Sequence, residues 1–277
     1  MLTFTYYFAM ETITSFQNPK IKNILLLQEK SRERKKQGLF VVEGERELLL
    51  ALEGGYNVEM LFTCTQLKPL AVEVVQKLSE VSKLYDLSKP VFDKLAYREN
   101  SDGLIAIVKA KPNGLENVKL SDNPFIIVLE AVEKPGNLGA IMRTADAAQV
   151  DAVVVCDPLC DMYNPNVIRS SVGCLFTTQI AIATSEEVLV WLRKNGVASY
   201  AAELQASQWY HETDMCKACA VVMGTEADGL TDFWLKNADA RIKIPMRGKI
   251  DSLNVSVSTA VLTFEAMRQR GFKRSLK

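Results

Sequence analysis

In the second half of the chain, short apolar segments alternate with segments of helical character, and this alternation constrains the fold more than any other feature. Six segments are apolar along nearly their whole length and are expected to be strands: Phe125–Val132, Ala152–Cys156, Thr178–Ala183, Ala198–Ala202, Ala218–Met223 and Ile242–Pro245. Strands that are apolar on both faces are typical of a mostly parallel sheet with helices covering each side. The sequence therefore predicts an α/β fold with a Rossmann-like sheet for this half.

Two helices of this half have recognisable ends or faces. The segment SEEVLVWLRKNG predicts a helix over 185–196, with Ser185 as its N-cap. The last helix carries four apolar residues at helical spacing, which predicts one buried stripe. These residues are Val257, Val261, Phe264 and Met267.

The chain divides at a segment of different composition. Residues 111–123 are poor in large apolar residues and rich in Pro, Gly, Asn and Asp, which predicts a linker. Before it, residues 10–110 begin with a basic helix over 19–37 and continue with alternating strands and helices, which indicates a smaller α/β domain. The parallel-sheet domain is expected over 124–277.

The first residues do not resemble a targeting signal. The segment MLTFTYYFAM is apolar but has neither a basic region nor a small-residue cleavage site. We therefore expect no signal peptide, and we expect translation to start at Met10 rather than at Met1.

Composition indicates a globular protein in a reducing compartment. Hydrophobic residues make up 48% of the chain and charged residues 24%, and no apolar run approaches the ~18 residues that cross a bilayer. Cys216 and Cys219 form a lone CxxC, for which Cys156 and Cys160 are the nearest candidate for a second pair. Buried reduced cysteine is the commoner alternative to a zinc site. We predict no metal, no membrane contact and a cytoplasmic location.

Basic residues are clustered although the formal net charge is zero. Residues 20–36 hold seven basic side chains and two acids, and residues 268–277 hold five basic side chains and no acid. Such clusters can follow a phosphate backbone, but a run of charge is also compatible with an ordinary solvated face.

Three loops follow expected strands at the edge of the sheet where parallel α/β proteins bind ligands: 133–139, 224–230 and 246–254. Neither GxGxxG nor GxxxxGK[ST] occurs, so a nucleotide-dependent oxidoreductase and a P-loop enzyme have little support. After the first loop, Arg143 lies off the apolar face of its helix. It could form a surface ion pair with Asp146 worth about 0.3 kcal/mol, or hold a phosphate or an oxyanion over the strand ends.

The second and third loops also carry polar residues with more than one interpretation. Glu226 follows a strand and a glycine, and it is either an ordinary turn residue or a side chain at the mouth of a site. Ser252 can cap the last helix. Asn254 is a poor helix former in the first turn and costs stability unless its amide has a role.

Taken together, these loops resemble the three motifs of the SpoU (TrmH-like) RNA ribose 2′-O-methyltransferases. The segments that carry the resemblance are NLGAIMRTA (137–145), GTEADGL (224–230), IPMRG (244–248) and SLNVS (252–256). NPNVIRSSVGCLF (164–176) is also similar, and NPKIKN with FVVEGEREL near the amino terminus is typical of members with an extra substrate-binding domain. Lys134 departs from the pattern, because many members have an acid there, and Ala148-Gln149 replaces a common Phe-Gly.

The resemblance implies a SPOUT fold in which the carboxy-terminal segment forms a trefoil knot that binds S-adenosyl-L-methionine (AdoMet). It also implies a homodimer with the substrate site at the subunit interface. By motif, the residues expected to contact AdoMet are Gly224, Ile244, Leu253, Met246 and Met223. The expected catalytic surroundings are Arg143, Asn137, Glu226, Ser252 and Asn254. Candidates for phosphate contacts in the amino-terminal domain are Lys20, Lys22, Arg32, Arg34, Lys35 and Lys36.

The implied reaction is methyl transfer from AdoMet to a ribose 2′-hydroxyl of RNA, in which the protein mainly positions the reactants. The only histidine, His211, lies away from all three motifs and is expected in a surface loop. The resemblance implies that Arg143 is the base. A cation that lowers the pKa of the hydroxyl is an equally physical role, and it suits a group that is normally always protonated. The extra domain favours ribosomal RNA; a tRNA methyltransferase and a catalytically silent RNA-binding protein are the alternatives.

Overall fold

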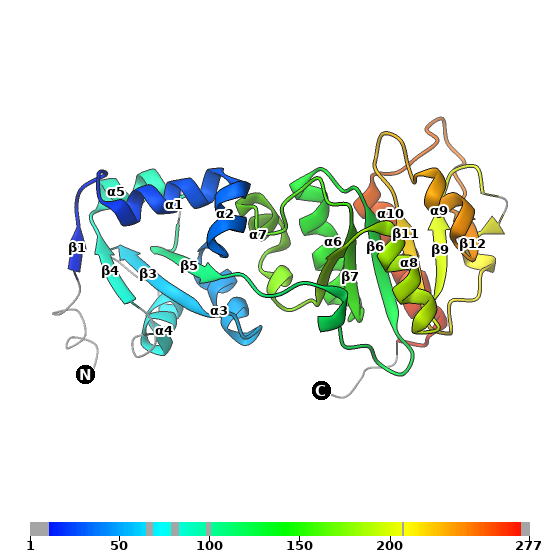
Figure 1. Ribbon diagram of the computed structural model, residues 1–277, viewed down its shortest axis with the longest axis horizontal. Coiled ribbons are helices and arrows are strands. Elements are labelled where there is room, and N and C mark those ends of the chain that lie inside the picture. The colour runs from blue at the N-terminus through cyan, green and yellow to red at the C-terminus, as the bar shows by residue number, and fades with distance from the viewer. Residues whose placement is uncertain (1–10, 65–68, 79–82, 98–100, 207, 273–277) are drawn as a thin grey trace. The chain divides into compact units, whose positions relative to one another are not determined.

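The computed structural model describes residues 11–64, 69–78, 83–97, 101–206 and 208–272, so Met10 and the end of the basic tail lie outside the described residues. The chain forms two compact units (Figure 1). One unit comprises 1–111 with 163–177, and the other comprises 112–162 with 178–277.

The first unit is built on a five-stranded mixed sheet of order β1-β4-β3-β5-β2. Its strands are β1 (Glu11–Ile13), β2 (Leu39–Glu43), β3 (Val58–Cys64), β4 (Lys83–Leu87) and β5 (Leu104–Lys109). Its helices are α1 (Pro19–Glu29), α2 (Ser31–Gln37), α3 (Glu45–Glu53), α4 (Pro69–Leu78), α5 (Lys89–Leu95) and α7 (Pro165–Ser171), with the 3-10 turn η3 (Cys174–Phe176). The strand β5 is antiparallel to both of its neighbours, β2 and β3.

The basic helix expected over 19–37 is two helices, because Lys30 is extended (φ −110°, ψ 105°) between α1 and α2. Arg34 of α2 is buried, and its guanidinium donates hydrogen bonds to the carbonyl oxygens of Leu27 (2.7 Å) and Gln28 (3.1 Å). These carbonyls lie in the last turn of α1, where helix carbonyls lack partners within the helix. Arg34 therefore fixes the bend between the two helices.

Residues 163–177 fall within the range expected for the second domain, yet they pack in the first unit. The ring of Tyr163 stacks on Phe40 with centroids 4.2 Å apart and planes at 11°. Phe176 meets Tyr56 edge-on at 5.1 Å. This aromatic cluster ties a late segment of the chain into the core of the first unit.

The second unit contains a seven-stranded sheet of order β10-β12-β9-β11-β6-β7-β8, in which every neighbouring pair is parallel. Its strands are β6 (Phe125–Glu130), β7 (Ala152–Cys156), β8 (Ile180–Ala183), β9 (Ala198–Ala202), β10 (Gln208–Trp209), β11 (Cys219–Met223) and β12 (Ala240–Lys243). Its helices are α6 (Pro135–Ala148), α8 (Ser185–Lys194), α9 (Asp232–Asn237) and α10 (Val255–Gln269), with 3-10 turns η2 (Leu115–Asn117) and η4 (Tyr210–Glu212). The predicted parallel sheet is confirmed.

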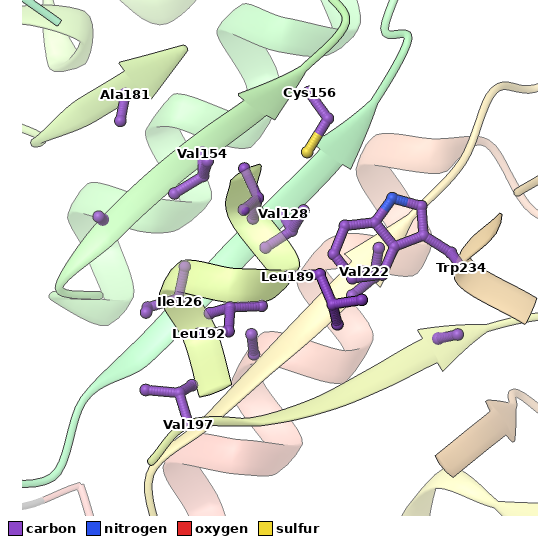
Figure 2. Close-up of a cluster of buried hydrophobic side chains, with 14 of the residues drawn as sticks. Ile126, Val128, Val154, Cys156, Ala181, Leu189, Leu192, Val197, Val222 and Trp234 are labelled. Atoms are coloured by element: carbon purple, nitrogen blue, oxygen red, sulfur yellow. The ribbon is translucent and has the colours of Figure 1, made fainter. Parts of the chain in front are cut away.

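Helices cover both faces of this sheet. On one face, Val188, Leu189 and Leu192 of α8 and Trp234 of α9 pack against alternate residues of the central strands (Figure 2). On the other, α6 packs beside α10, and these helices contact β7 and β11 respectively. This two-sided covering explains why the central strands β6, β7 and β11 are buried along their whole length.

Three details of the predicted helices are wrong. Helix α8 is capped by Thr184, which forms a capping box with Glu187, rather than by Ser185. Helix α10 is capped by Asn254 rather than by Ser252. The expected stripe on α10 is not buried as a whole, since Val257 is 48% and Phe264 42% exposed. The buried face of α10 is instead formed by Val255, Thr259, Leu262, Thr263 and Ala266.

Within the described ranges, none of the helices has the length and apolar character that a membrane-spanning helix requires.

Candidate functional site

A cavity of about 490 Å³ opens at the carboxyl ends of β9, β11 and β12. Its wall is formed by residues of four segments, 202–205, 223–230, 242–246 and 251–253, together with the start of α10. All five residues predicted to contact a cofactor line it: Met223, Gly224, Ile244, Met246 and Leu253. The volume lies in the range of pockets that enclose small organic ligands.

The loop after β11 requires a glycine at its start. A Cβ added to Gly224 would lie 2.1 Å from the carbonyl carbon of Gly229 and 2.3 Å from the nitrogen of Leu230. The loop closes on itself through two backbone hydrogen bonds between Thr225 and Gly229, of 2.9 and 3.2 Å. Gly229 itself has φ +71°, which other residues rarely adopt. This part of the cavity wall is thus a tight turn, and a larger residue at Gly224 would displace it.

The far end of this loop is held by Glu130, a buried acid at the end of β6. Its carboxylate accepts hydrogen bonds from the backbone N–H of Thr231 (2.8 Å) and from the Thr231 hydroxyl (2.7 Å). Ser185 also donates to it at 3.4 Å and to Asp157 at 2.8 Å. We did not predict Glu130 as a site residue, although an acid that ends an otherwise apolar strand is a visible signal.

Three of the predicted catalytic residues meet beside the cavity. The amide nitrogen of Asn254 donates to the side-chain oxygen of Asn137 (3.2 Å) and to the Glu226 carboxylate. Its amide oxygen accepts from the N–H (3.0 Å) and the hydroxyl (2.6 Å) of Ser256. The cap interaction therefore fixes which end of the Asn254 amide faces the other two residues.

An ion pair that we did not predict completes this cluster. Lys134, just before α6, pairs with Glu226, whose other oxygen accepts from Asn254. The hydrogen bond from Lys134 is the main cause that lowers the pKa of Glu226, and the same bond raises the pKa of Lys134. The Glu226 carboxylate is therefore ionised, and Lys134 neutralises its negative charge.

The other two predicted catalytic residues lie outside this cluster. Ser252 lines the cavity, and its hydroxyl donates to Asp251 at 3.2 Å. Arg143 is exposed on α6, and its guanidinium forms no hydrogen bond or ion pair with another residue in the part of the chain that the structure describes. The alternative ion pair with Asp146 is therefore not formed, and Arg143 does not line the cavity of its own chain.

The predicted phosphate contacts divide into two groups. Lys22, Arg32, Lys35 and Lys36 are exposed, and Lys20 is half-buried. Lys20 lies 3.7 Å from Glu11 and over the ring of Tyr85. Arg34 is only 4% exposed and its guanidinium binds α1 carbonyls, which argues against a phosphate contact for this residue.

The histidine and the cysteines lie apart from this chemistry. His211 is exposed beside Trp209 and Tyr210 and does not line the cavity. Burial raises the pKa of the Cys156 thiol to about 12, so this thiol stays protonated at neutral pH. No group of three metal-binding side chains occurs within the described residues.

Comparisons with known proteins agree with this geometry. The model of the SpoU rRNA Methylase family matches residues 124–264, and that of the MRM3-like substrate binding domain matches residues 18–106. The 23S rRNA (guanosine(2553)-2′-O)-methyltransferase RlmP of Bacillus subtilis is 29% identical over 92% of this chain and 98% of its own length.

Two solved structures are similar to nearly the whole chain. A crystal structure of an RNA 2′-O ribose methyltransferase superposes with a TM-score of 0.81 at 38% identity, covering 94% of this chain and 99% of that one. The AdoMet-bound rRNA methyltransferase of Sinorhizobium meliloti superposes with a TM-score of 0.86 at 28% identity, covering 94% and 98%. Because the family model spans half of the chain and includes the three loops that form the cavity and its polar cluster, this protein belongs to the SpoU rRNA methylase family.

Proposed function

We propose that this protein transfers a methyl group from AdoMet to a ribose 2′-hydroxyl of RNA, and that the RNA is ribosomal. The observation that carries the proposal is the meeting of Asn137, Glu226 and Asn254 beside a cavity lined by all five residues expected to contact AdoMet. Two proteins that match nearly the whole chain, RlmP and the RNA 2′-O ribose methyltransferase, are named as enzymes of this reaction, and a third is named as an AdoMet-bound rRNA methyltransferase.

The cavity suits AdoMet in size and in chemistry. Met223, Ile244 and Leu253 supply apolar wall, while the tight turn after Gly224 brings backbone close to the ligand. When bound, AdoMet supplies an activated methyl group. The protein then has to hold the ligand, orient the ribose and manage the proton of its hydroxyl.

Arg143 is the group of this chain that best manages that proton. An exposed guanidinium free of partners among the described residues can lie against the RNA of a neighbouring site. There it lowers the pKa of the 2′-hydroxyl and stabilises the forming alkoxide. This role needs only the charged form of arginine, whereas a role as the base needs the neutral form.

A homodimer would bring Arg143 to a cavity. Helix α10 exposes Val257 and Phe264, and Phe272 beyond its end is 57% exposed. The ring centroids of Phe264 and Phe272 lie 6.5 Å apart, and exposed apolar side chains that gather in this way can form a surface that another protein covers. In this proposal a second copy covers it, and Arg143 of one protomer faces the cavity of the other.

Two further features belong to the proposal. The segment between β12 and α10 passes through the neighbouring loop as a trefoil knot, which agrees with the contact that brings Asn254 onto Glu226. The first unit recognises RNA through its exposed basic residues, so affinity falls steeply with salt concentration. The cytoplasmic location stays a prediction.

A labelled-methyl assay tests the proposed function. The purified protein is incubated with methyl-labelled AdoMet and either ribosomal RNA or tRNA from cells that lack it, and 2′-O-methyl sites are mapped by resistance to alkaline hydrolysis. We expect label in one position of ribosomal RNA. Label in tRNA alone would favour the tRNA alternative, and salt-sensitive RNA binding without label would favour the silent RNA-binding protein.

A further inference from the structure

The ion pair between Lys134 and Glu226 links two of the three site loops. Lys134 is the residue before α6, and Glu226 lies in the turn after β11. The side chain of Glu226 is 24% exposed, while that of Lys134 is 67% exposed. The lysine therefore approaches the carboxylate from the solvent side.

The other contacts of Glu226 come from neutral groups. Asn254 and Asn137 supply side-chain hydrogen bonds, and the backbone N–H of Val255 supplies another. Lys134 is the one described charge that acts directly on this carboxylate, and Glu133 is a further charge near the lysine. Without Lys134, an uncompensated negative charge would stand at the cavity wall, where a polyanionic substrate has to approach.

We propose that Lys134 is a positioning residue: its ammonium group holds the Glu226 carboxylate against the Asn254 amide and neutralises it at the cavity wall. Glu226 presents two oxygens, and each has a separate donor, one from the first loop and one from the third. A carboxylate with both oxygens occupied cannot rotate freely. The expected effect of Lys134 on methyl transfer rests on the proposed function. Its effect on the position and charge of the Glu226 carboxylate does not.

The first experiment measures the carboxylate itself. The pKa of Glu226 is followed by carbon NMR in protein with labelled glutamate, for the parent, Lys134→Ala and Lys134→Arg. The pKa should rise in Lys134→Ala, because the main cause that lowers it is gone, and stay low in Lys134→Arg. The control Lys249→Ala removes an exposed lysine of the third loop and should leave this pKa unchanged. An unchanged pKa in Lys134→Ala would overturn the proposal even if the protein methylates nothing.

The second experiment is a double-mutant cycle on methyl transfer with Glu226→Gln. Lys134→Ala should lower kcat/KM by about two- to fivefold, as expected for an exposed ion pair. The acid limb of its pH profile should move to higher pH, because Glu226 then protonates more easily. In the Glu226→Gln background, removal of Lys134 should cost little more.

The outcomes of the two experiments are separable. An inactive parent enzyme contradicts the proposed function and leaves the NMR result to decide on Lys134. An active parent in which Lys134→Ala equals the parent, or in which the two substitutions are fully additive, contradicts the positioning role alone. Lys134→Arg should restore most of the activity, because it retains the charge.

Discussion

At the scale of single residues, Asn254 combines a structural and a functional contact in one amide. Its oxygen caps α10 through Ser256, and its nitrogen donates to Asn137 and Glu226. Asparagine is among the preferred residues at an N-cap, so its place at the start of α10 does not cost stability. The expectation that this amide has a role is consistent with the structure, but the role includes the cap that we had assigned to Ser252.

Two substitutions of Asn254 should separate these contacts. Asn254→Ser keeps an N-cap oxygen and loses the amide nitrogen, so the free energy of unfolding should change little while methyl transfer falls. Asn254→Ala loses both and should also lower the free energy of unfolding by about 1 kcal/mol. Urea denaturation and the labelled-methyl assay measure the two effects. Equal destabilisation by both substitutions would contradict the cap assignment.

Gly224 allows a close approach of backbone to backbone. In Gly224→Ala the new Cβ would collide with the carbonyl of Gly229, so the turn has to move and the cavity wall with it. We expect weaker AdoMet binding in calorimetry, together with a lower melting temperature. Gly248→Ala is the matched control in the neighbouring loop, because a Cβ there meets nothing within 4 Å. Normal AdoMet affinity in Gly224→Ala would show that this turn is not part of the ligand site.

Arg143 should affect the reaction without affecting the cofactor. It lies outside the cavity of its own chain, so Arg143→Ala should bind AdoMet like the parent and lose methyl transfer by about 100-fold or more, as when a group that stabilises a transition-state charge is removed. Calorimetry measures the first quantity and the labelled-methyl assay the second. Arg143→Lys keeps the charge, and recovery of part of the rate would favour electrostatic stabilisation. Retained turnover in Arg143→Ala would remove this residue from the mechanism.

At the scale of elements, strand positions were predictable and helix ends were not. The bounds of β7 and β9 are those predicted. Strand β7 is buried on both faces and therefore apolar along its whole length. Helix caps depend on neighbours that the local sequence does not contain: Ser185 looked like a cap, but its hydroxyl binds Asp157. The break at Lys30 has no glycine or proline to signal it. Ser88 before Lys89-Pro90 did signal the start of α5, and we missed it.

The bend between α1 and α2 yields a prediction at this scale. Arg34→Ala leaves buried carbonyls of α1 without donors, so the free energy of unfolding should fall by about 2 kcal/mol. Lys35→Ala removes an exposed charge one residue later, so stability should stay the same while RNA affinity falls modestly. Denaturation and filter binding distinguish the two. A stable Arg34→Ala protein with weakened RNA binding would restore Arg34 to the phosphate contacts.

At the scale of the whole molecule, the alternation of strands and helices predicted a parallel sheet but could not give its order. Strand β11 lies between β9 and β6 in the sheet, although β7 and β8 stand between β6 and β9 in the sequence. That order brings the ends of β9, β11 and β12 around one cavity. It depends on long-range pairing, which a local pattern of apolar residues does not encode. The rule that parallel sheets bind ligands at the carboxyl ends of their strands singled out the three loops, and the family motifs supplied the roles of the residues within them.

The exposed apolar residues of α10 also show that a local pattern does not encode long-range contacts, and they lead to the last prediction. Helical spacing marked Val257 and Phe264 as apolar but could not tell a face that meets the core from one that meets a second protein. If a second copy covers this face, the parent protein should sediment as a dimer, and Phe264→Asp should sediment as a monomer with an unchanged circular dichroism spectrum, because Phe264 is exposed within its own chain.

The monomer should not methylate RNA, whether or not its affinity for AdoMet changes, because Arg143 would no longer reach the cavity of a partner. Val190→Asp is the matched control: it places the same charge on α8, where Val190 is 65% exposed. That variant should remain dimeric and active. Should Phe264→Asp stay dimeric, the interface lies elsewhere. Should it become monomeric and still methylate RNA, one chain would suffice for the reaction, and the shared site would be excluded.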